Sequence, residues 1–355
     1  MGITYIENYA AWASAAASSI EVTSMVNPSS TFSIVAGNRS GGYALQASFP
    51  NNTAAYYTKT MLRTPATVWV AWRSVCDQAT SSGANMIVSL GEAAGNTHVV
   101  FAYDASYQLV AYNNDKSVTY GTVSGLTQGA WHQFVAKVVI SDTVGSIEIR
   151  MDGDTTPVVN VTSLDTKNAG SGVVSRITIG DTTGAPIGAS GTIWRIMDLA
   201  VWDNDGNSPS GWVGDVRVDD YAPDGAGSST QWTPLSSANY SNVDEAAANE
   251  DTDYVYASIS GKLDYYTVAD ITHNPTTIYS VSTSAVAKKT DASFRGFNLK
   301  MLSNSVTSTG PSVTLTNGTY LRYYAHYGAD PGTSAEWTVA KFNAIEAGMT
   351  AGWPS

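Results

Sequence analysis

Two acidic residues with even spacing, Glu148 and Asp152, are the first candidates for chemistry in this sequence of 355 residues. Glycoside hydrolysis uses two carboxylates that flank the bond to be broken, and residues at even spacing on a strand share one face. Arg150 lies between the two, however, and Asp152 precedes Gly153 in a pair typical of turns. We therefore expect Asp152 to be a turn residue and the pair not to be catalytic.

The four histidines of the chain are scattered singly through expected strands and turns. The sequence contains no Gly-x-Ser-x-Gly motif, no His or Cys pair with the spacing of zinc ligands and no glycine-rich phosphate loop. We interpret His132, which follows Trp131, as a residue at the edge of a core. The sequence thus predicts no catalytic residue, no bound cofactor, and a protein that is not an enzyme.

Acidic loops raise the question of calcium. Residues 203–207, DNDGN, look like the middle of an EF-hand loop, but aligning their glycine with the invariant one puts Val201 and Trp212 where acidic ligands are required. A turn is the better interpretation. The acidic clusters at residues 219–220 and 244–253 are typical of solvated loops, and Ca²⁺ binding there is the alternative left open.

The elements that position these residues are expected to be strands. In residues 133–140 and 146–151 apolar side chains alternate with polar ones, and turn residues separate the two runs. This pattern predicts an antiparallel hairpin, which needs a second apolar layer to be stable. Phe134, Ala136 and Val138 belong to one of its two candidate inward faces.

Further strands are expected at residues 31–35, 43–48, 54–62, 67–75, 85–90, 97–103, 108–112, 118–123, 158–161, 173–180 and 191–202. So many short strands without a long helical pattern predict an all-β sandwich.

The composition excludes several classes of partner. Hydrophobic residues make up 43% of the chain, charged residues only 14%, and the net charge is −12. A nucleic-acid binder needs a basic face, and no apolar run approaches the roughly 20 residues that span a bilayer. The N-terminus lacks the pattern of a signal peptide, and the single cysteine, Cys76, allows no intrachain disulfide.

The second half of the chain predicts a separate, smaller β domain. We expect a first β domain at residues 31–208, a connection at 209–240 and the second domain at 241–355. Its strands are expected at residues 254–260, 263–269, 276–287, 294–302 and 319–327. A short C-terminal helix should follow, with Ser334 as N-cap, Gly348 at its end, and Trp337, Phe342 and Ile345 on one face.

Residues 1–30 are expected to form an N-terminal docking segment with a short helix at residues 8–17. Tyr5, Tyr9 and Trp12 would be its exposed docking side chains, and the C-terminal helix is the alternative docking element.

The motifs of the first domain resemble those of laminin-G-like, concanavalin-A-like jelly rolls. Gly129-x-Trp131-His132 comes first, then SIEIRMDG at residues 146–153, ITIG at 177–180 and IMDLAVW at 196–202. The match covers roughly residues 30 to 205. It implies the fold and leaves the ligand open, because one fold hosts many functions.

The whole chain resembles structural proteins of tailed bacteriophages, in which such a jelly roll is followed by a smaller β domain. The cues in the second half are Trp212 to Val218, Pro223-Asp-Gly225 and Trp232, then Asn242 to Glu245, Asp251 to Tyr254 and the segment from Glu336 to Gly348. The resemblance implies a non-enzymatic protein of the virion surface, made in the bacterial cytoplasm: a capsid decoration, head fibre or tail accessory protein. It also implies a homotrimer that contacts other virion proteins.

The alternative function is a lectin-like module that binds host or environmental glycans. Aromatic side chains on strands can stack on sugars, and Tyr103, Tyr107, Tyr112, Tyr323 and Tyr324 are the candidates. Most strand tyrosines are instead half-buried core or interface residues.

Overall fold

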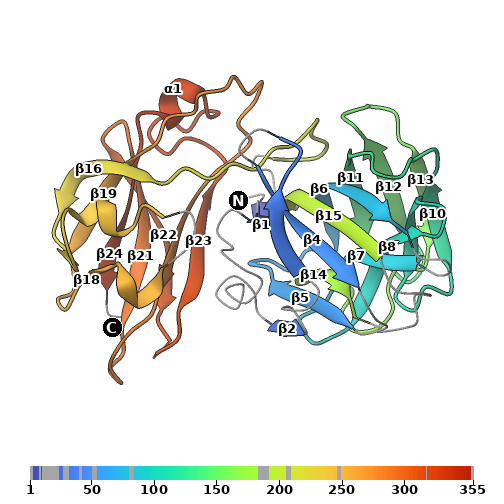
Figure 1. Ribbon diagram of the computed structural model, residues 1–355, viewed down its shortest axis with the longest axis horizontal. Coiled ribbons are helices and arrows are strands. Elements are labelled where there is room, and N and C mark those ends of the chain that lie inside the picture. The colour runs from blue at the N-terminus through green and yellow to red at the C-terminus, as the bar shows by residue number, and fades with distance from the viewer. Residues whose placement is uncertain are drawn as a thin grey trace. The chain divides into compact units, whose positions relative to one another are not determined.

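The structure is a computed structural model that describes residues 3–7, 9, 24–26, 32–39, 42–49, 54–79, 84–182, 192–204, 209–245, 249–316 and 318–352. The chain forms two compact units (Figure 1). The N-terminal unit comprises residues 2–205 and 210–219, and the C-terminal unit comprises residues 206–209 and 220–355 together with residue 1. The predicted all-β fold is confirmed in both units.

Two antiparallel sheets make up the N-terminal unit. Sheet A runs in the order β13-β12-β11-β6-β15-β4-β3, and β1 pairs with the second half of β15. Its strands are β1 (Ile3–Glu7), β3 (Phe32–Ala36), β4 (Tyr43–Phe49), β6 (Thr67–Gln78), β11 (His132–Val139), β12 (Gly145–Met151), β13 (Val159–Leu164) and β15 (Thr192–Trp202). Sheet B runs in the order β10-β9-β8-β7-β14-β5-β2. Its strands are β2 (Ser24–Val26), β5 (Ala55–Thr60), β7 (Ala84–Gly91), β8 (Thr97–Asp104), β9 (Leu109–Asn113), β10 (Thr119–Val123) and β14 (Arg176–Asp181).

The core of this unit lies between the two sheets because each strand turns every second side chain inward. Trp72 of β6 is fully buried, and its ring centroid lies 5.1 Å from that of Phe101 in sheet B and 5.5 Å from that of Phe134 in sheet A. Truncation of such a buried aromatic side chain to alanine costs about 3–5 kcal/mol.

The predicted hairpin is confirmed. β11 pairs with β12 in antiparallel register, with Ala136 opposite Ile149. Phe134, Ala136, Val138 and Ile140 all belong to the core, so this is the inward face. Asp152 adopts φ 52 in the turn after β12 and accepts hydrogen bonds from the backbone N–H of Gln133 and from His132, both at 2.8 Å.

The C-terminal unit contains a sheet of five strands and two short ribbons within its described residues. Sheet C has the order β16-β19-β24-β21-β22 and comprises β16 (Pro223–Thr230), β19 (Leu263–Val268), β21 (Gly296–Ser303), β22 (Val306–Thr314) and β24 (Glu346–Gly352). The ribbons are β17 (Thr233–Pro234) with β18 (Val255–Tyr256), and β20 (Val281–Ala287) with β23 (Leu321–Tyr327). The core between sheet C and the longer ribbon includes Phe297, Met301 and Ala325.

The C-terminal helix is present, although its limits differ from the prediction. α1 (Val339–Phe342) is a single turn, and Thr338 rather than Ser334 is its N-cap, because the Thr338 hydroxyl accepts from the N–H of Lys341. Gly348 lies inside β24 and does not end the helix. Trp337, Phe342 and Ile345 share the core and are therefore not free for docking. Only Phe342 lies in α1, so the predicted common helix face is not formed.

Three strands of sheet C lie where the sequence predicted none. β16 has the composition of a loop, β22 contains Gly310 and Pro311, and β24 follows the helix directly. Each pairs with a partner distant in the sequence, and that pairing overrides weak local preference. The N-terminal segment also differs, since residues 3–7 form β1, while most of the expected helix, including Trp12, lies outside the described residues. Within the described residues, no helix is long and apolar enough to cross a membrane.

Candidate functional site

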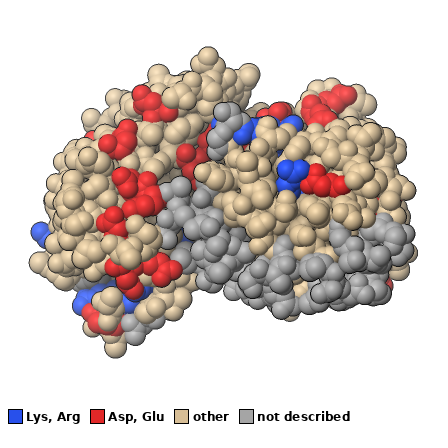
Figure 2. Space-filling model, viewed as in Figure 1, with Lys and Arg blue, Asp and Glu red and all other residues tan. Residues whose placement is uncertain are grey.

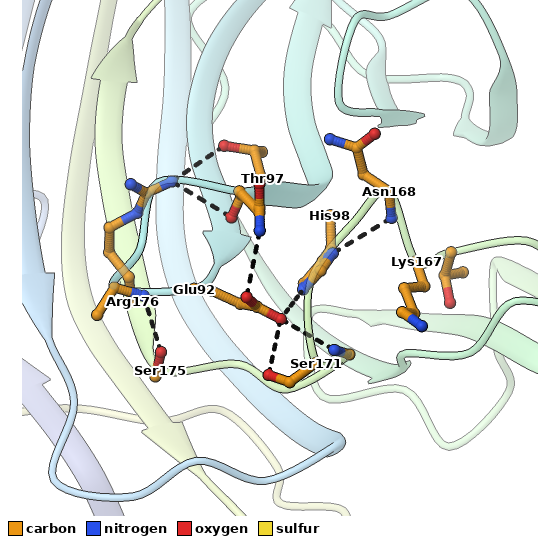
Figure 3. Close-up of polar contacts among 12 residues, drawn as sticks. Glu92, Thr97, His98, Lys167, Asn168, Ser171, Ser175 and Arg176 are labelled. Carbon is orange, nitrogen blue, oxygen red and sulfur yellow. Dashed lines mark hydrogen bonds and ion pairs between the residues drawn. The ribbon is translucent and has the colours of Figure 1, made fainter.

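A polar cluster of the N-terminal unit surrounds Glu92, at the turn between β7 and β8 (Figure 3). This side chain is only 6% exposed. Its carboxylate accepts hydrogen bonds from the Ser171 hydroxyl at 3.0 Å, the Gly172 N–H at 2.9 Å and the Asn96 amide at 3.3 Å. Burial favours a raised pKa for Glu92, but these donors outweigh it and lower the pKa to about 2. Glu92 is therefore a carboxylate at neutral pH.

His98 completes the cluster: its Nδ1 is hydrogen-bonded, and its Nε2 faces Glu92 without a hydrogen bond. Nε2 lies 3.4 Å from Glu92 Oε1, and Nδ1 accepts from the backbone N–H of Asn168 at 3.3 Å. The ring is 1% exposed, and burial lowers its pKa despite the nearby carboxylate. A general base needs a free lone pair within reach of its substrate, so His98 in this conformation holds the loop and does not face a ligand.

Two further contacts join the same segments. Arg176 donates to the carbonyl of Gly95 and to the Thr97 hydroxyl, both at 3.1 Å, and the Ser175 hydroxyl accepts from the N–H of Ala93 at 2.8 Å (Figure 3). The cluster thus ties the β7–β8 turn to the loop before β14. Sequence reasoning missed it because its members come from residues 92–98 and 168–176 and share no local motif.

A second buried carboxylate lies on the outer face of sheet A. Asp198 adopts φ 53 at an irregularity in the β15–β6 pairing, is 1% exposed, and accepts from the N–H of Val218 at 3.0 Å. Its other oxygen lies 3.4 Å from Nε of Arg39, which also pairs with Asp215. Burial raises the pKa of Asp198 to about 6, against the lowering effects of the Val218 N–H and Arg39. The arrangement fastens residues 210–219 to the sheet.

The candidate glycan-stacking tyrosines of the N-terminal unit are not brought together. Tyr103 is 2% exposed and bonds the Ser74 hydroxyl at 2.9 Å inside the core. Tyr107 is half-buried against that core. Tyr112 is half-buried on the opposite face of sheet B, against a cluster that contains Met86. Tyr103 therefore has no exposed ring face for a sugar, because the alternation of side chains along β8 points it into the core.

The candidates of the C-terminal unit are also engaged in packing. Tyr323 is half-buried and meets the ring of Phe297 edge-on, with 5.6 Å between centroids. Tyr324 points to the other face of β23 and stacks on His326 at 5.9 Å. One face of the Tyr324 ring is thus already occupied.

The expectation that Tyr5 and Tyr9 are exposed docking residues is wrong. Tyr5 and Tyr9 are 3% and 0% exposed, and the Tyr9 hydroxyl lies 2.7 Å from that of Tyr57 in the core. They are buried because β1 adds to sheet A. Trp12 lies outside the described residues.

Glu148 and Asp152, the two evenly spaced carboxylates, have different hydrogen-bond partners. Glu148 bonds its neighbour Arg150 at 3.0 Å, whereas Asp152 bonds His132 in the turn. Among the described residues, no three His, Cys, Asp or Glu side chains converge on a metal position. Residues 205–207 of the EF-hand-like stretch lie outside the described part.

A pair of neighbouring tyrosines occurs instead at β18: Tyr256 ends the strand and is exposed, and Tyr254 directly precedes it and is half-buried. Their ring centroids are 6.3 Å apart. Tyr256 is 47% exposed, and so is Leu235, whose N–H bonds the carbonyl of Tyr254 at 2.9 Å. The exposure of Tyr256 follows from the short ribbon that β18 forms with β17.

Tyr320 is bonded to Asp251, three residues before this pair. Its hydroxyl donates to Asp251 at 3.0 Å, and Nζ of Lys288 lies 4.3 Å from its ring centroid and 2.7 Å from the same carboxylate. Burial raises the pKa of Tyr320, and its hydrogen bond to Asp251 raises it further. We call Tyr254, Tyr256, Tyr320, Lys288 and Asp251 the Tyr254 cluster.

No protein family and no curated protein matches the sequence. Solved structures with a similar fold include the cellulose-induced protein Cip1, with 16% identity, a TM-score of 0.35, and coverage of 48% of this chain and 84% of that one. Alginate lyase vAL-1 from Chlorella virus is 9% identical with a TM-score of 0.34, covering 51% of this chain and 99% of the lyase. The catalytic domain of the glycoside hydrolase family 131 protein from Coprinopsis cinerea is 8% identical with a TM-score of 0.37, covering 60% and 98%. These neighbours are concanavalin-A-like jelly-roll sandwiches, and the likeness concerns the fold alone.

One expectation from the sequence is corrected by these neighbours. The absence of familiar catalytic motifs predicted a protein that is not an enzyme, yet the similar structures include enzymes by name: alginate lyases, sialidases and a glycoside hydrolase. The exclusion of catalysis is therefore wrong as a general inference from this sequence. Its physical weakness is that catalytic groups on such sheets come from different strands and need no local motif.

Proposed function

We propose that this chain is a carbohydrate-binding protein and that the Tyr254 cluster is its glycan-contacting surface. The observation that carries the proposal is the pair of tyrosine rings at β18, of which Tyr256 is 47% exposed. The hydrogen-bonded group of Tyr320, Lys288 and Asp251 lies three residues before the pair, at Asp251. Ring faces attract the C–H faces of sugars, and nearby polar groups fix hydroxyl orientation.

The short ribbon is a suitable platform for such a contact. Tyrosine carries a large contact area on only two rotatable side-chain bonds, so little conformational entropy is lost when a ligand covers it. Leu235, 47% exposed beside Tyr254, widens the apolar part of the surface. Contiguous exposed apolar surface with polar side chains at its rim marks binding sites.

A glycan array probed with the full chain tests the proposal. We expect binding that falls at least tenfold in Tyr256→Ala and in Tyr254→Ala. Tyr43→Ala is the matched control, because Tyr43 is 44% exposed in the N-terminal unit and has no part in the cluster. The absence of any glycan bound by the folded wild-type chain would refute the proposal, as would equal losses in the Tyr43 variant.

We further propose that the protein acts at the surface of a tailed-phage virion as a homotrimer in contact with other virion proteins. The order of the motifs from Gly129 to Gly348 supports this setting, through the resemblance stated above. Glycan binding and virion display are compatible, since a surface protein that binds sugars assists adsorption. Detection of the chain on purified particles by mass spectrometry and immunogold labelling tests the setting, and its absence from particles would contradict it.

A further inference from the structure

Two strands of the C-terminal unit bring a serine and a histidine together. β20 and β23 pair in antiparallel register, with Ser282 opposite His326. The Ser282 hydroxyl and Nδ1 of His326 lie 2.5 Å apart, which is the contact that a nucleophilic hydroxyl makes with its base. Neither residue belongs to the Tyr254 cluster, so this pair is a separate place for chemistry.

The alternation of side chains along the two strands sets this pair apart from the core. Val281, which precedes Ser282, and Tyr327, which follows His326, belong to the core of the unit. Because successive side chains of a strand point to opposite faces, Ser282 and His326 lie on the face turned away from that core. Ser282 is half-buried there, and Ser284, the next serine on the same face, is exposed. The Ser282 hydroxyl is therefore on a partly accessible face of the ribbon.

The imidazole of His326 is held in one orientation and is neutral. Tyr324 stacks on it from the same face of β23, with 5.9 Å between ring centroids and 14° between the ring planes. His326 is 2% exposed, and burial lowers its pKa to about 4. A neutral ring that carries its proton on Nε2 directs the Nδ1 lone pair at the Ser282 hydroxyl, as a general base must.

A positive charge lies further along the same face. Arg322 is two residues before Tyr324 on β23, and its Nη1 donates to the Ser284 hydroxyl at 3.0 Å. Ser284 is in turn two residues from Ser282 on β20. A fixed cationic donor beside an attacking hydroxyl stabilises the oxyanion that forms when the hydroxyl adds to a carbonyl carbon.

From this geometry we infer a second activity, in which Ser282 is the nucleophile and His326 the general base for transfer of an acyl group from a neutral carboxylic ester to water. Ser282 Oγ bonds to the acyl carbon while its proton passes to His326 Nδ1, and that proton then goes to the alcohol oxygen as the ester C–O bond breaks. Water next attacks the acyl-serine, its proton returns through His326 to Ser282 Oγ, and the carboxylic acid leaves.

The charge of the unit favours a neutral ester over an anionic one. Acidic side chains predominate on the visible face of the C-terminal unit (Figure 2), and the net charge of the chain is −12. A field of this sign lowers the local concentration of anions.

A fluorophosphonate probe and p-nitrophenyl acetate test the inference on the full chain. The probe should modify a single serine, which peptide mass spectrometry should locate at Ser282, and the chain should release p-nitrophenol faster than buffer does. Ser282→Ala should abolish both reactions, and His326→Gln should slow both by about a hundredfold. Labelling of the wild-type chain is the decisive measurement, because it needs no variant to fold.

The matched control is Ser308→Ala, because Ser308 is also a half-buried strand serine of this unit but lies in β22, outside the ribbon. It should keep both reactions. Three outcomes would overturn the inference: no labelling of the folded wild-type chain, labelling that persists in Ser282→Ala, or full activity in a folded His326→Gln variant. Each would show that the pair is a structural hydrogen bond, and none of them bears on glycan binding by the Tyr254 cluster.

Discussion

The carboxylate of Glu92 and the imidazole of His98 lie 3.4 Å apart inside the N-terminal unit, and residues 168–172 close over them. Two residues six positions apart thus become the anchor for a loop some 80 residues further along the chain. Fixed loops at the end of a sandwich are the places where such folds carry function, and this anchor keeps one of them in a single arrangement.

Removal of the anchor should destabilise the protein. Glu92→Ala would leave the Ser171 hydroxyl and the Gly172 N–H without their acceptor, and a buried unsatisfied donor costs about 1–3 kcal/mol. We expect a lower free energy of unfolding by about that amount in chemical denaturation. Asp142→Ala removes an exposed carboxylate paired with Lys167 and should change stability by less than about 0.5 kcal/mol. An equal effect of the two variants would contradict the assignment.

The charge of Glu92 should also make the free energy of unfolding depend on pH in the acidic range. Its pKa in the folded protein is about 2, below its ordinary value of 4.5, so its contribution is present above pH 4.5 and is lost as the pH falls toward 2. The difference in unfolding free energy between wild type and Glu92→Gln should therefore be constant near neutral pH and shrink below pH 4.5. A difference independent of pH would show that the charge of Glu92 has no such role.

Asp198 should change the free energy of unfolding with pH in the direction opposite to Glu92. Burial raises its pKa from 3.8 to about 6, so it stabilises the fold most below pH 3.8, and this contribution is lost as the pH rises through 6. Asp198→Asn keeps an oxygen for the Val218 N–H and tolerates φ 53, while it removes the buried charge. We expect the variant to lose stability relative to wild type at pH 4 and to match or exceed it at pH 7, as followed by thermal unfolding. A deficit at pH 7 that exceeds the deficit at pH 4 would refute this sign.

Gly170 tests how closely the loop fits over Glu92. A Cβ at this position would lie 2.2 Å from Glu92 Oε2, and the residue adopts φ 81. Gly170→Ala should therefore lower the melting temperature through both a clash and backbone strain. Gly95→Ala is the control for strain, because Gly95 also has a positive φ, 112, but open space where a Cβ would lie. If the two variants melt at the same temperature, the clash has no energetic weight.

The local sequence was sufficient for most strands of the N-terminal unit. The runs at residues 133–140 and 146–151 match β11 and β12 closely, because period two is a property of each strand and needs no knowledge of its partner. β16, β22 and β24 escaped prediction because their residues have weak strand preference and are held by pairing with β19 and β21.

For the candidate sites, too, some features followed from the local sequence and others from the tertiary structure. From the sequence alone, alternation determined the all-β class and the two candidate inward faces of the hairpin, one of which contains Phe134 and Ala136. Only the tertiary structure decided which face of each strand is covered: sheet A covers Tyr103 of sheet B, whereas the short β17–β18 ribbon leaves Tyr256 exposed. It also brought Glu92 to Ser171, and Tyr320 and Lys288 to Asp251. The reason is physical, since alternation is set by backbone geometry within one strand, while burial and contact depend on segments far apart in the chain.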